Sequence, residues 1–147
     1  MALLKYTICI ECLLGKSNHC ICSENPKSYS GIAYCFIHED ENHENNFKPH
    51  ACQTPKRVNN AKHLLGKCAL FGLSFFKDAE KAKTLHRGMN GRGNANSFSE
   101  TNGTLLASVN LSPQIGVYDE IDAKSHFNFF EYVGVNLFDN IKNKEII

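Results

Sequence analysis

Five short segments rich in β-branched and aromatic residues constrain most strongly what this chain can fold into. Each is bounded by glycine, proline or polar residues, which is typical of strands. They comprise residues 31–38, 69–76, 104–111, 114–119 and 125–133, and residues 135–138 could extend the last one. The pattern predicts a sheet of about five strands.

One clear helix is predicted, directly after the second of these segments. Asp78 has the side chain of an N-cap, and the residues that follow it favour a helix over residues 79–87. Gly88 fits the position just past a helix end. A strand followed at once by a capped helix is therefore expected at the centre of the chain.

The predicted fold class is α+β: a single compact domain over residues 1–147, with a mixed or mainly antiparallel sheet and few helices. Its core would span residues 31–138. Residues 1–30 form an N-terminal segment whose apolar part fits either a strand or a short buried helix. Residues 39–60 and 88–103 are polar and contain many turn-forming residues, so we expect loops there.

The composition excludes several classes of protein. Of the 147 residues, 42% are hydrophobic, 10% aromatic and 21% charged, which argues against a disordered, collagen-like or coiled-coil chain. The formal net charge of +1 gives no global field that would favour nucleic acid or a membrane surface. No stretch approaches the ~20 apolar residues of a membrane span. The apolar start resembles a signal peptide but carries Glu11 at its centre, so we expect a cytoplasmic location.

Seven cysteines, six of them before residue 53, raise the question of a zinc site. Cys9, Cys12, Cys20 and Cys22 form two closely spaced pairs that could supply four ligands. A second set of residues could also close a site: Cys35, His38, His43, His50 and Cys52. The alternative is that the thiols are buried apolar groups in a reducing compartment and the histidines lie on the surface.

Three short stretches follow one another in an order that resembles compact ADP-ribosyltransferase-like domains. A strand over residues 32–38 ends at His38, residues 72–82 combine a strand carrying Ser74 with the start of a helix, and Glu131 lies on a late strand. The resemblance covers roughly residues 31–133. It implies a nucleotide-binding cleft that takes a nicotinamide dinucleotide such as NAD.

The same resemblance implies a role for each of these side chains. His38 would hydrogen-bond the cofactor ribose, Ser74 would support the nicotinamide, and Glu131 would stabilise an oxocarbenium-like centre and orient the acceptor. Aromatic side chains would line the cleft and stack on the nicotinamide ring: Tyr34, Phe36, Phe76 and Phe130. Cys35 stands where the family carries Arg or His. Alternatively, Ser74 is an ordinary strand serine and Glu131 points to water.

A basic stretch indicates a different kind of partner. Residues 53–93 contain nine Lys or Arg residues against only Asp78 and Glu80. The glycine-rich part of this stretch could cradle a phosphate with its backbone amides. Contact with nucleic acid or phosphate through Lys56 to Arg92 is therefore a further prediction, although charge segregation of this kind is also typical of a solvated surface.

Two classes of function follow from these observations. The first is a small microbial accessory or toxin-like protein with a nucleotide-binding cleft of the ADP-ribosyltransferase type. The second is a non-enzymatic binding module, with or without a stabilising zinc, that contacts a protein or an anionic partner. A catalytic cysteine–histidine pair would need Cys35 or Cys68, and both lie in apolar strands, where thiols are usually inert.

Overall fold

The computed structural model describes residues 4–6, 26–61, 69–91 and 97–147. Its centre is a six-stranded antiparallel sheet in the order β4-β5-β2-β1-β3-β6. The strands are β1 (Gly31–Ile37), β2 (Leu73–Phe76), β3 (Leu105–Leu111), β4 (Gly116–Tyr118), β5 (His126–Glu131) and β6 (Ile141–Ile146). The predicted α+β class with a mainly antiparallel sheet is confirmed.

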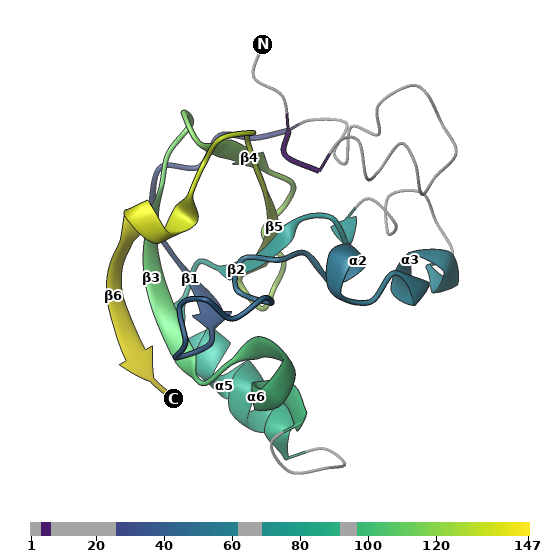
Figure 1. Ribbon diagram of the computed structural model, residues 1–147. Coiled ribbons are helices and arrows are strands. Elements are labelled where there is room, and N and C mark those ends of the chain that lie inside the picture. Colours follow the sequence, from purple (N-terminus) through teal and green to yellow (C-terminus); the bar gives the residue numbers. More distant parts are fainter. Residues whose placement is uncertain (1–3, 7–25, 62–68, 92–96) are drawn as a thin grey trace.

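Helices cover one side and one end of this sheet. They are α2 (His50–Gln53), α3 (Lys56–Asn60), α5 (Ala79–Asn90) and α6 (Ser97–Asn102), with a 3-10 turn η1 at Leu137–Asn140. Helices α5 and α6 pack against each other, and α2 and α3 lie together (Figure 1). Among the residues that the structure describes, no helix has the length and apolar character needed to cross a membrane.

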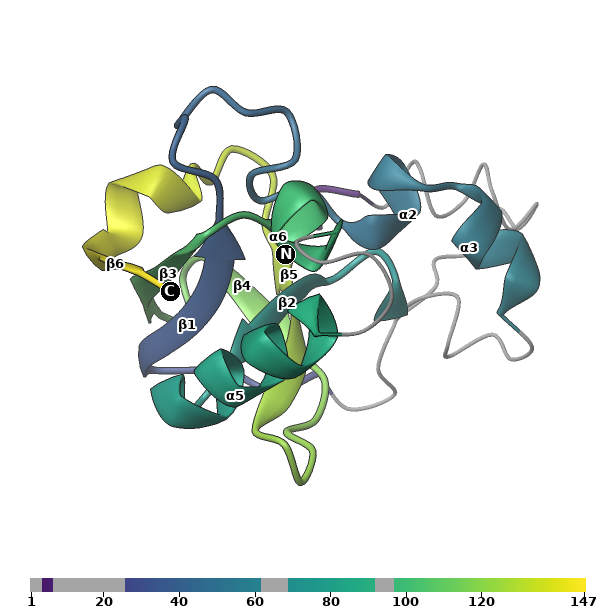
Figure 2. The same cartoon turned by 90° about the horizontal axis from the view of Figure 1, so that it is seen from below.

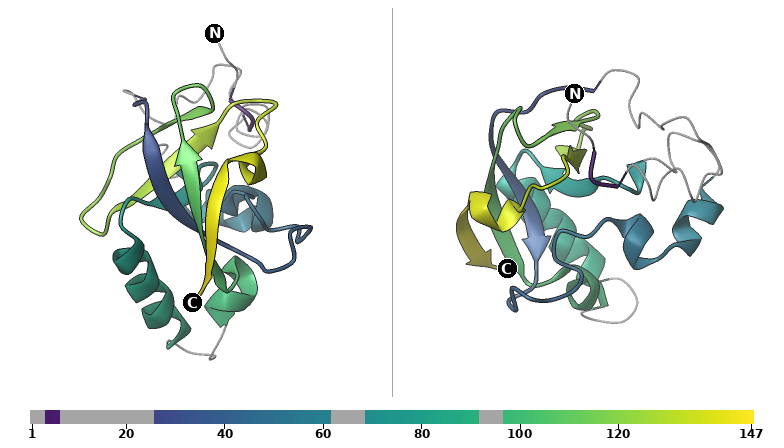
Figure 3. Two further views of the ribbon diagram at one scale, coloured as in Figure 1. Left: turned by 90° about the vertical axis from the view of Figure 1, so that its left-hand side faces the viewer. Right: turned by 45° about the horizontal axis from the view of Figure 1, so that its top comes forward.

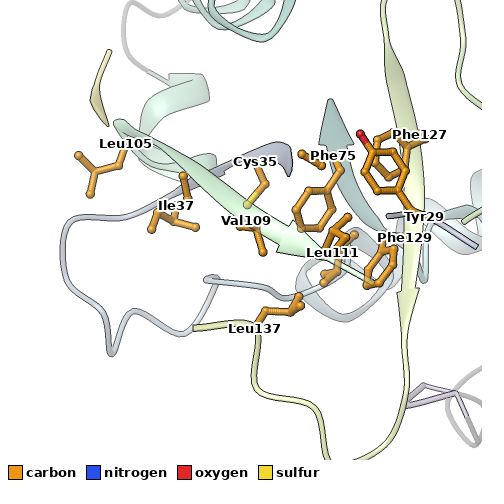
Figure 4. Packing of buried hydrophobic residues seen from close by; sticks show 13 residues of the cluster. Tyr29, Cys35, Ile37, Phe75, Leu105, Val109, Leu111, Phe127, Phe129 and Leu137 are labelled. Carbon is orange, nitrogen blue, oxygen red and sulfur yellow. The ribbon is translucent and has the colours of Figure 1, made fainter. Parts of the chain in front are cut away.

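Strand alternation divides the core between the two faces of the sheet. On one face, alternate residues of β1, β2 and β5 pack together, including Cys35, Phe75 and Phe127 (Figure 4). On the other face, Phe36 and Phe76 pack against Ala82 of α5, which crosses the sheet there (Figure 2). Both faces of the central strands are therefore apolar, as the uninterrupted apolar segments indicate.

Helix α5 begins where the sequence predicts and ends later. The Asp78 carboxylate accepts a hydrogen bond from the Lys81 backbone N–H at 3.1 Å, which is the predicted N-cap. The predicted end at Gly88 is wrong, because the helix continues to Asn90. Asn90 exchanges hydrogen bonds with Ser99 of α6, and this tertiary contact outweighs the weak helix preference of Gly88.

Four further expectations about elements are corrected. Strand β2 begins at Leu73, because the preceding residues turn. Residues 135–138 do not extend β5 but lead into η1. The stretches 39–60 and 88–103 are not loops throughout, because the first contains α2 and α3 and the second contains α6. The polar C-terminal residues, for which the sequence predicts no element, form β6, which pairs with β3 at the end of the described strand order (Figure 3).

Candidate functional site

Two polar side chains meet on neighbouring strands, on the face of the sheet that α5 partly covers. Ser74 lies in β2 and is paired with Asn128 of β5, so His126 is its diagonal neighbour across the strands. The Nε2 atom of His126 lies 3.0 Å from the Ser74 hydroxyl oxygen. This distance suits transfer of the hydroxyl proton to the imidazole.

An acidic side chain lies at the other end of the same imidazole. The Oδ2 atom of Asp122 is 3.8 Å from His126 Nδ1, which is too long for a hydrogen bond but close enough for charge to act. Its Oδ1 atom accepts hydrogen bonds from the backbone N–H groups of Lys124 and His126, at 2.8 and 2.9 Å. These hydrogen bonds hold the Asp122 carboxylate close to the imidazole of His126.

The turn between Asp122 and His126 is held in a strained conformation. Ser125 has a φ of +63°, which is uncommon for a residue other than glycine. Its carbonyl oxygen accepts from the Lys77 N–H, and its hydroxyl accepts from the Asp78 N–H, at 2.9 and 3.2 Å. These two hydrogen bonds join the turn to the residues that directly follow β2, which fixes His126 relative to Ser74.

The environment keeps His126 neutral at pH 7. Burial lowers the pKa of its imidazole below the usual 6.5, and the carboxylates of Asp122 and Asp119 oppose this shift. Burial also lowers the pKa of His50, aided by the charge of Arg57 and by His126 itself. A neutral imidazole beside a hydroxyl can accept its proton, which is the arrangement of a general base and its nucleophile.

Ser74 also lines a cavity of about 50 Å³. Strands β1 and β2 are paired only at Tyr34 and Phe76, and the cavity lies where their remaining residues are not joined by a ladder. Its walls come from these two strands, from α2, α6 and the loop before α2, and they include Phe36, His50 and Thr101. Ser74 is therefore a residue of the cavity wall, and its hydroxyl contacts a base, His126.

The three side chains of the predicted cofactor cleft lie at different places on the sheet. Strand alternation puts Ser74 on the face of Phe76 and puts Glu131 on the opposite face, with Phe129. His38 follows β1, where its Nε2 lies 3.1 Å from the Thr101 carbonyl oxygen. Their common role stays a prediction, and this placement does not favour one cleft shared by all three.

Glu131 itself is buried, with a side chain that is only 1% exposed. The Lys5 ammonium lies 3.2 Å from its Oε1 atom. Among the described residues neither carboxylate oxygen has a hydrogen bond of good geometry. Burial raises the pKa of Glu131, and the Lys5 charge opposes this. The expectation that Glu131 either serves a cofactor or points to water does not anticipate this buried ion pair.

The aromatic residues predicted to line the cleft mostly fill the layer under the helices. Phe36 contacts Phe76, His86 and Phe98, with ring centroids 5.5, 5.0 and 5.7 Å apart. Tyr34 packs at the border of the same cluster. Phe130 belongs to another small cluster, together with residues of α2 and the turn before β2. Phe36 alone of these four borders the cavity beside Ser74.

The structure describes the residues of only one of the two predicted zinc sites. Cys9, Cys12, Cys20 and Cys22 lie outside the described residues. Within the described ranges, no three His, Cys, Asp or Glu side chains come together in a way that could hold a metal, so the second predicted set is not supported. Cys35 is buried in the main core, where burial raises the pKa of its thiol. His38 and His43 instead stack on each other, with ring centroids 3.5 Å apart.

The predicted basic stretch does not form one continuous element. Lys56 and Arg57 lie on α3, whereas Lys81 and Lys83 lie on α5. The Lys83 ammonium is paired with carboxylates of Glu80 and Glu145, at 3.4 and 2.8 Å. Contact of the stretch from Lys56 to Arg92 with phosphate or nucleic acid stays a prediction.

Two residues of the Ser74 site were not anticipated from the sequence. His126 and Asp122 are four residues apart, but about 50 residues separate them from Ser74. The one local signal is the Asp–x–x–x–His spacing at the start of a strand, which is too common to indicate a site. Only the register of β2 against β5 brings the three together.

Comparison with known proteins does not assign the chain to a family. No protein-family model matches the chain, and no curated protein or solved structure is significantly similar to it. Any functional conclusion therefore rests on the residues themselves.

Proposed function

We propose that the chain is a small hydrolase that uses Ser74 as nucleophile and His126 as general base. The observation that carries this proposal is the 3.0 Å contact between the Ser74 hydroxyl and His126 Nε2, at the wall of a cavity. Serine, histidine and an acidic residue in these roles recur on unrelated folds and are recognised by geometry.

The chemistry would follow the usual course of acyl transfer. As the Ser74 oxygen bonds to the carbonyl carbon of an ester, its proton moves to His126 Nε2. The ester C–O bond then breaks, and the leaving alcohol takes that proton from His126. Water, deprotonated by His126, attacks the acyl-serine, which releases the acid and restores the hydroxyl. Ester and water thus give acid and alcohol.

Each neighbour has a definable part in this scheme. Asp122 would orient the imidazole and stabilise its protonated form, at a distance that makes it a positioning residue. Asn45 and Lys48 line the cavity and carry donors that could stabilise the oxyanion. The side-chain amides of two other lining residues, Gln53 and Asn102, already donate to backbone carbonyls.

The test is hydrolysis of an activated ester by the purified chain and by two variants. Ser74→Ala removes the nucleophile, and His126→Gln removes the base while keeping a polar side chain of similar reach. Both should lose the activity, and trapping of the wild-type acyl intermediate should modify the peptide that contains Ser74. Equal hydrolysis by wild type and Ser74→Ala would reject the proposal, since exposed lysines and histidines also cleave activated esters slowly.

The nucleotide cleft predicted from the sequence remains a separate proposal that calorimetry with NAD can test. Glu131→Gln should abolish cofactor turnover if Glu131 acts on the cofactor, and should leave ester hydrolysis unchanged. Absence of NAD binding at millimolar concentration would reject the nucleotide cleft. It would have no bearing on the proposed hydrolase activity of Ser74.

A further inference from the structure

The charges around the cavity beside Ser74 limit the substrate of the proposed hydrolase. We infer that this site selects esters that carry a carboxylate, and that Lys48 binds that carboxylate. The inference rests on the proposed function, because it assigns the surroundings of the cavity to the ester that Ser74 would cleave.

Helix α2 lies on the same face of the sheet as the Ser74 side chain. Strand alternation puts Phe130 of β5 on the face of His126 and Ser74. Ala51 of α2 packs against Phe130, and its neighbour His50 lines the cavity. His126 is also one of the groups that lower the pKa of His50, which agrees with this placement. A substrate that reaches Ser74 from this face therefore meets α2 and the loop before it.

The walls of the cavity contain no carboxylate among the residues that the structure describes. Seven lining side chains carry oxygen or nitrogen atoms: Asn45, Lys48, His50, Gln53, Ser74, Thr101 and Asn102. Lys48 is the one charged side chain of this set at pH 7, because burial and the charge of Arg57 lower the pKa of His50 below 6.5. The described walls therefore carry a net positive charge.

The Lys48 ammonium forms no ion pair with any residue that the structure describes, whereas Lys83 and Lys144 are paired with carboxylates. Lys48 is partly buried. Its backbone is held at both ends, since its N–H donates to the Asn45 carbonyl oxygen at 3.3 Å and its own carbonyl accepts from Gln53 at 2.7 Å. A partly buried cation without a partner attracts an anion more strongly than one surrounded by water.

The charges nearby reinforce this attraction. Arg57 of α3 is exposed, has no ion pair with a described residue, and acts on His50. Asp122 faces His126 Nδ1, whereas Nε2 faces the serine hydroxyl. Asp119 is bound to the backbone and side-chain amides of its neighbour on β5. The cations thus lie on the α2 side of the site and these two acids on the other side of the imidazole.

The experiment compares two pairs of esters that differ in charge. 4-Nitrophenyl hydrogen adipate and 4-nitrophenyl hexanoate have acyl chains of equal length and the same leaving group, and only the first carries a carboxylate. 4-Acetoxybenzoate and its methyl ester place the same difference in the leaving group. For each ester the rate of Ser74→Ala is subtracted, and each ratio is divided by the ratio for uncatalysed hydrolysis. We expect kcat/KM to be about tenfold higher for the anionic member of at least one pair, and salt should reduce this preference.

A pair of variants tests whether Lys48 causes the preference. Lys48→Met removes the charge and keeps an apolar side chain of similar length, so the ratio of anionic to neutral ester should fall to about one. A role in oxyanion stabilisation alone would lower both rates equally and leave the ratio unchanged. Lys142→Met is the matched control, because Lys142 is exposed on β6, has no ion pair with a described residue, and is separated from β2 by β1 and β3. It should keep the ratio, and circular dichroism checks that both variants fold.

Three contrary results have different meanings. Hydrolysis that depends on Ser74 but is equal for the anionic and neutral members of both pairs would overturn the inference and leave the proposed function standing. A preference for anionic esters that persists in Lys48→Met would overturn the role of Lys48. Absence of any Ser74-dependent hydrolysis would reject the proposed function, and the inference with it.

Discussion

His126 is the residue on which the proposed chemistry depends most. Its pKa is lowered by burial, and Asp122 and Asp119 are the charges that work against this shift. A lowered pKa leaves the imidazole free to accept a proton at neutral pH and below. The hydrolysis rate should therefore fall at a lower pH than an unperturbed histidine would give.

Replacement of Asp122 should show its effect on the pKa of His126 and its effect on the reaction rate as two separate changes. Asp122→Asn keeps an oxygen for the backbone N–H groups of Lys124 and His126 but removes the charge. The pKa of His126 should fall further, so the acid limb of kcat/KM moves to lower pH. The plateau should drop by about tenfold, because the protonated imidazole loses its stabilising charge.

The control for that variant is Asp119→Asn. Asp119 also raises the pKa of His126, but its carboxylate bonds the backbone and side chain of Asn128 rather than facing the ring. Its variant should shift the acid limb and leave the plateau in place. A profile of Asp122→Asn that moves to higher pH would contradict the assigned geometry.

Glu131 should make the stability of the fold depend on pH. Its pKa in the folded protein is raised above the value of 4.5 for an exposed carboxyl. The folded state therefore binds this proton more tightly than the unfolded state, and the resulting stability is lost as the pH rises through the folded pKa. Glu131→Gln should raise Tm more at pH 7.5 than at pH 4.5. The same change in Tm at both pH values would show that Lys5 compensates the buried charge fully.

At the scale of elements, two glycines with opposite surroundings test the packing between strands and helices. Gly103 has a φ of +98°, and a Cβ atom there would lie 2.0 Å from the Ile37 carbonyl oxygen. Gly103→Ala should destabilise the fold by about 3 kcal/mol or more, since both the backbone conformation and the close approach require glycine. Gly88 lies inside α5, where a Cβ atom would meet nothing within 4 Å.

Gly88→Ala is therefore the control, with the opposite sign. It should stabilise the fold by about 0.5–1 kcal/mol, because alanine loses less entropy than glycine in a helix. Urea unfolding of both variants checks the pair. A stabilising effect at Gly103 would mean that the residue between α6 and β3 does not have a positive φ close to the Ile37 backbone.

The elements that sequence could predict are those that carry their own signal. Strands β1 and β3 are apolar on one or both faces, and α5 has an N-cap, so local chemistry is sufficient to find them. Strand β6 consists of Ile-Lys-Asn-Lys-Glu-Ile, and all its residues after Ile141 are exposed. No apolar period marks it, because its stability comes from the ladder with β3. Helices α2 and α3 are likewise too short to show a period.

At the scale of the whole molecule, the candidate site illustrates the limit of sequence reasoning. Ser74 could be singled out as a polar residue within an apolar strand. Its partner His126 becomes visible only when β2 and β5 are paired in register, since residues distant in the chain have no fixed separation before folding. The cavity depends in addition on the incomplete pairing of β1 and β2, which no local pattern encodes.

The order of the strands predicts how protection from hydrogen exchange is distributed over the molecule. Strands β1 and β3 pair with each other over seven residues, lie inside the sheet and carry core residues with exposed fractions near zero, such as Ala33 and Val109. Their amides should exchange only on global unfolding. Among the described strands β6 pairs on one side only, and Ile146 is 76% exposed, so its amides should exchange through local opening at much lower free energy. Native-state exchange measured by NMR at several urea concentrations distinguishes the two regimes. Exchange of β6 as slow as that of β1 would contradict an open edge and would mean that another strand covers it in solution.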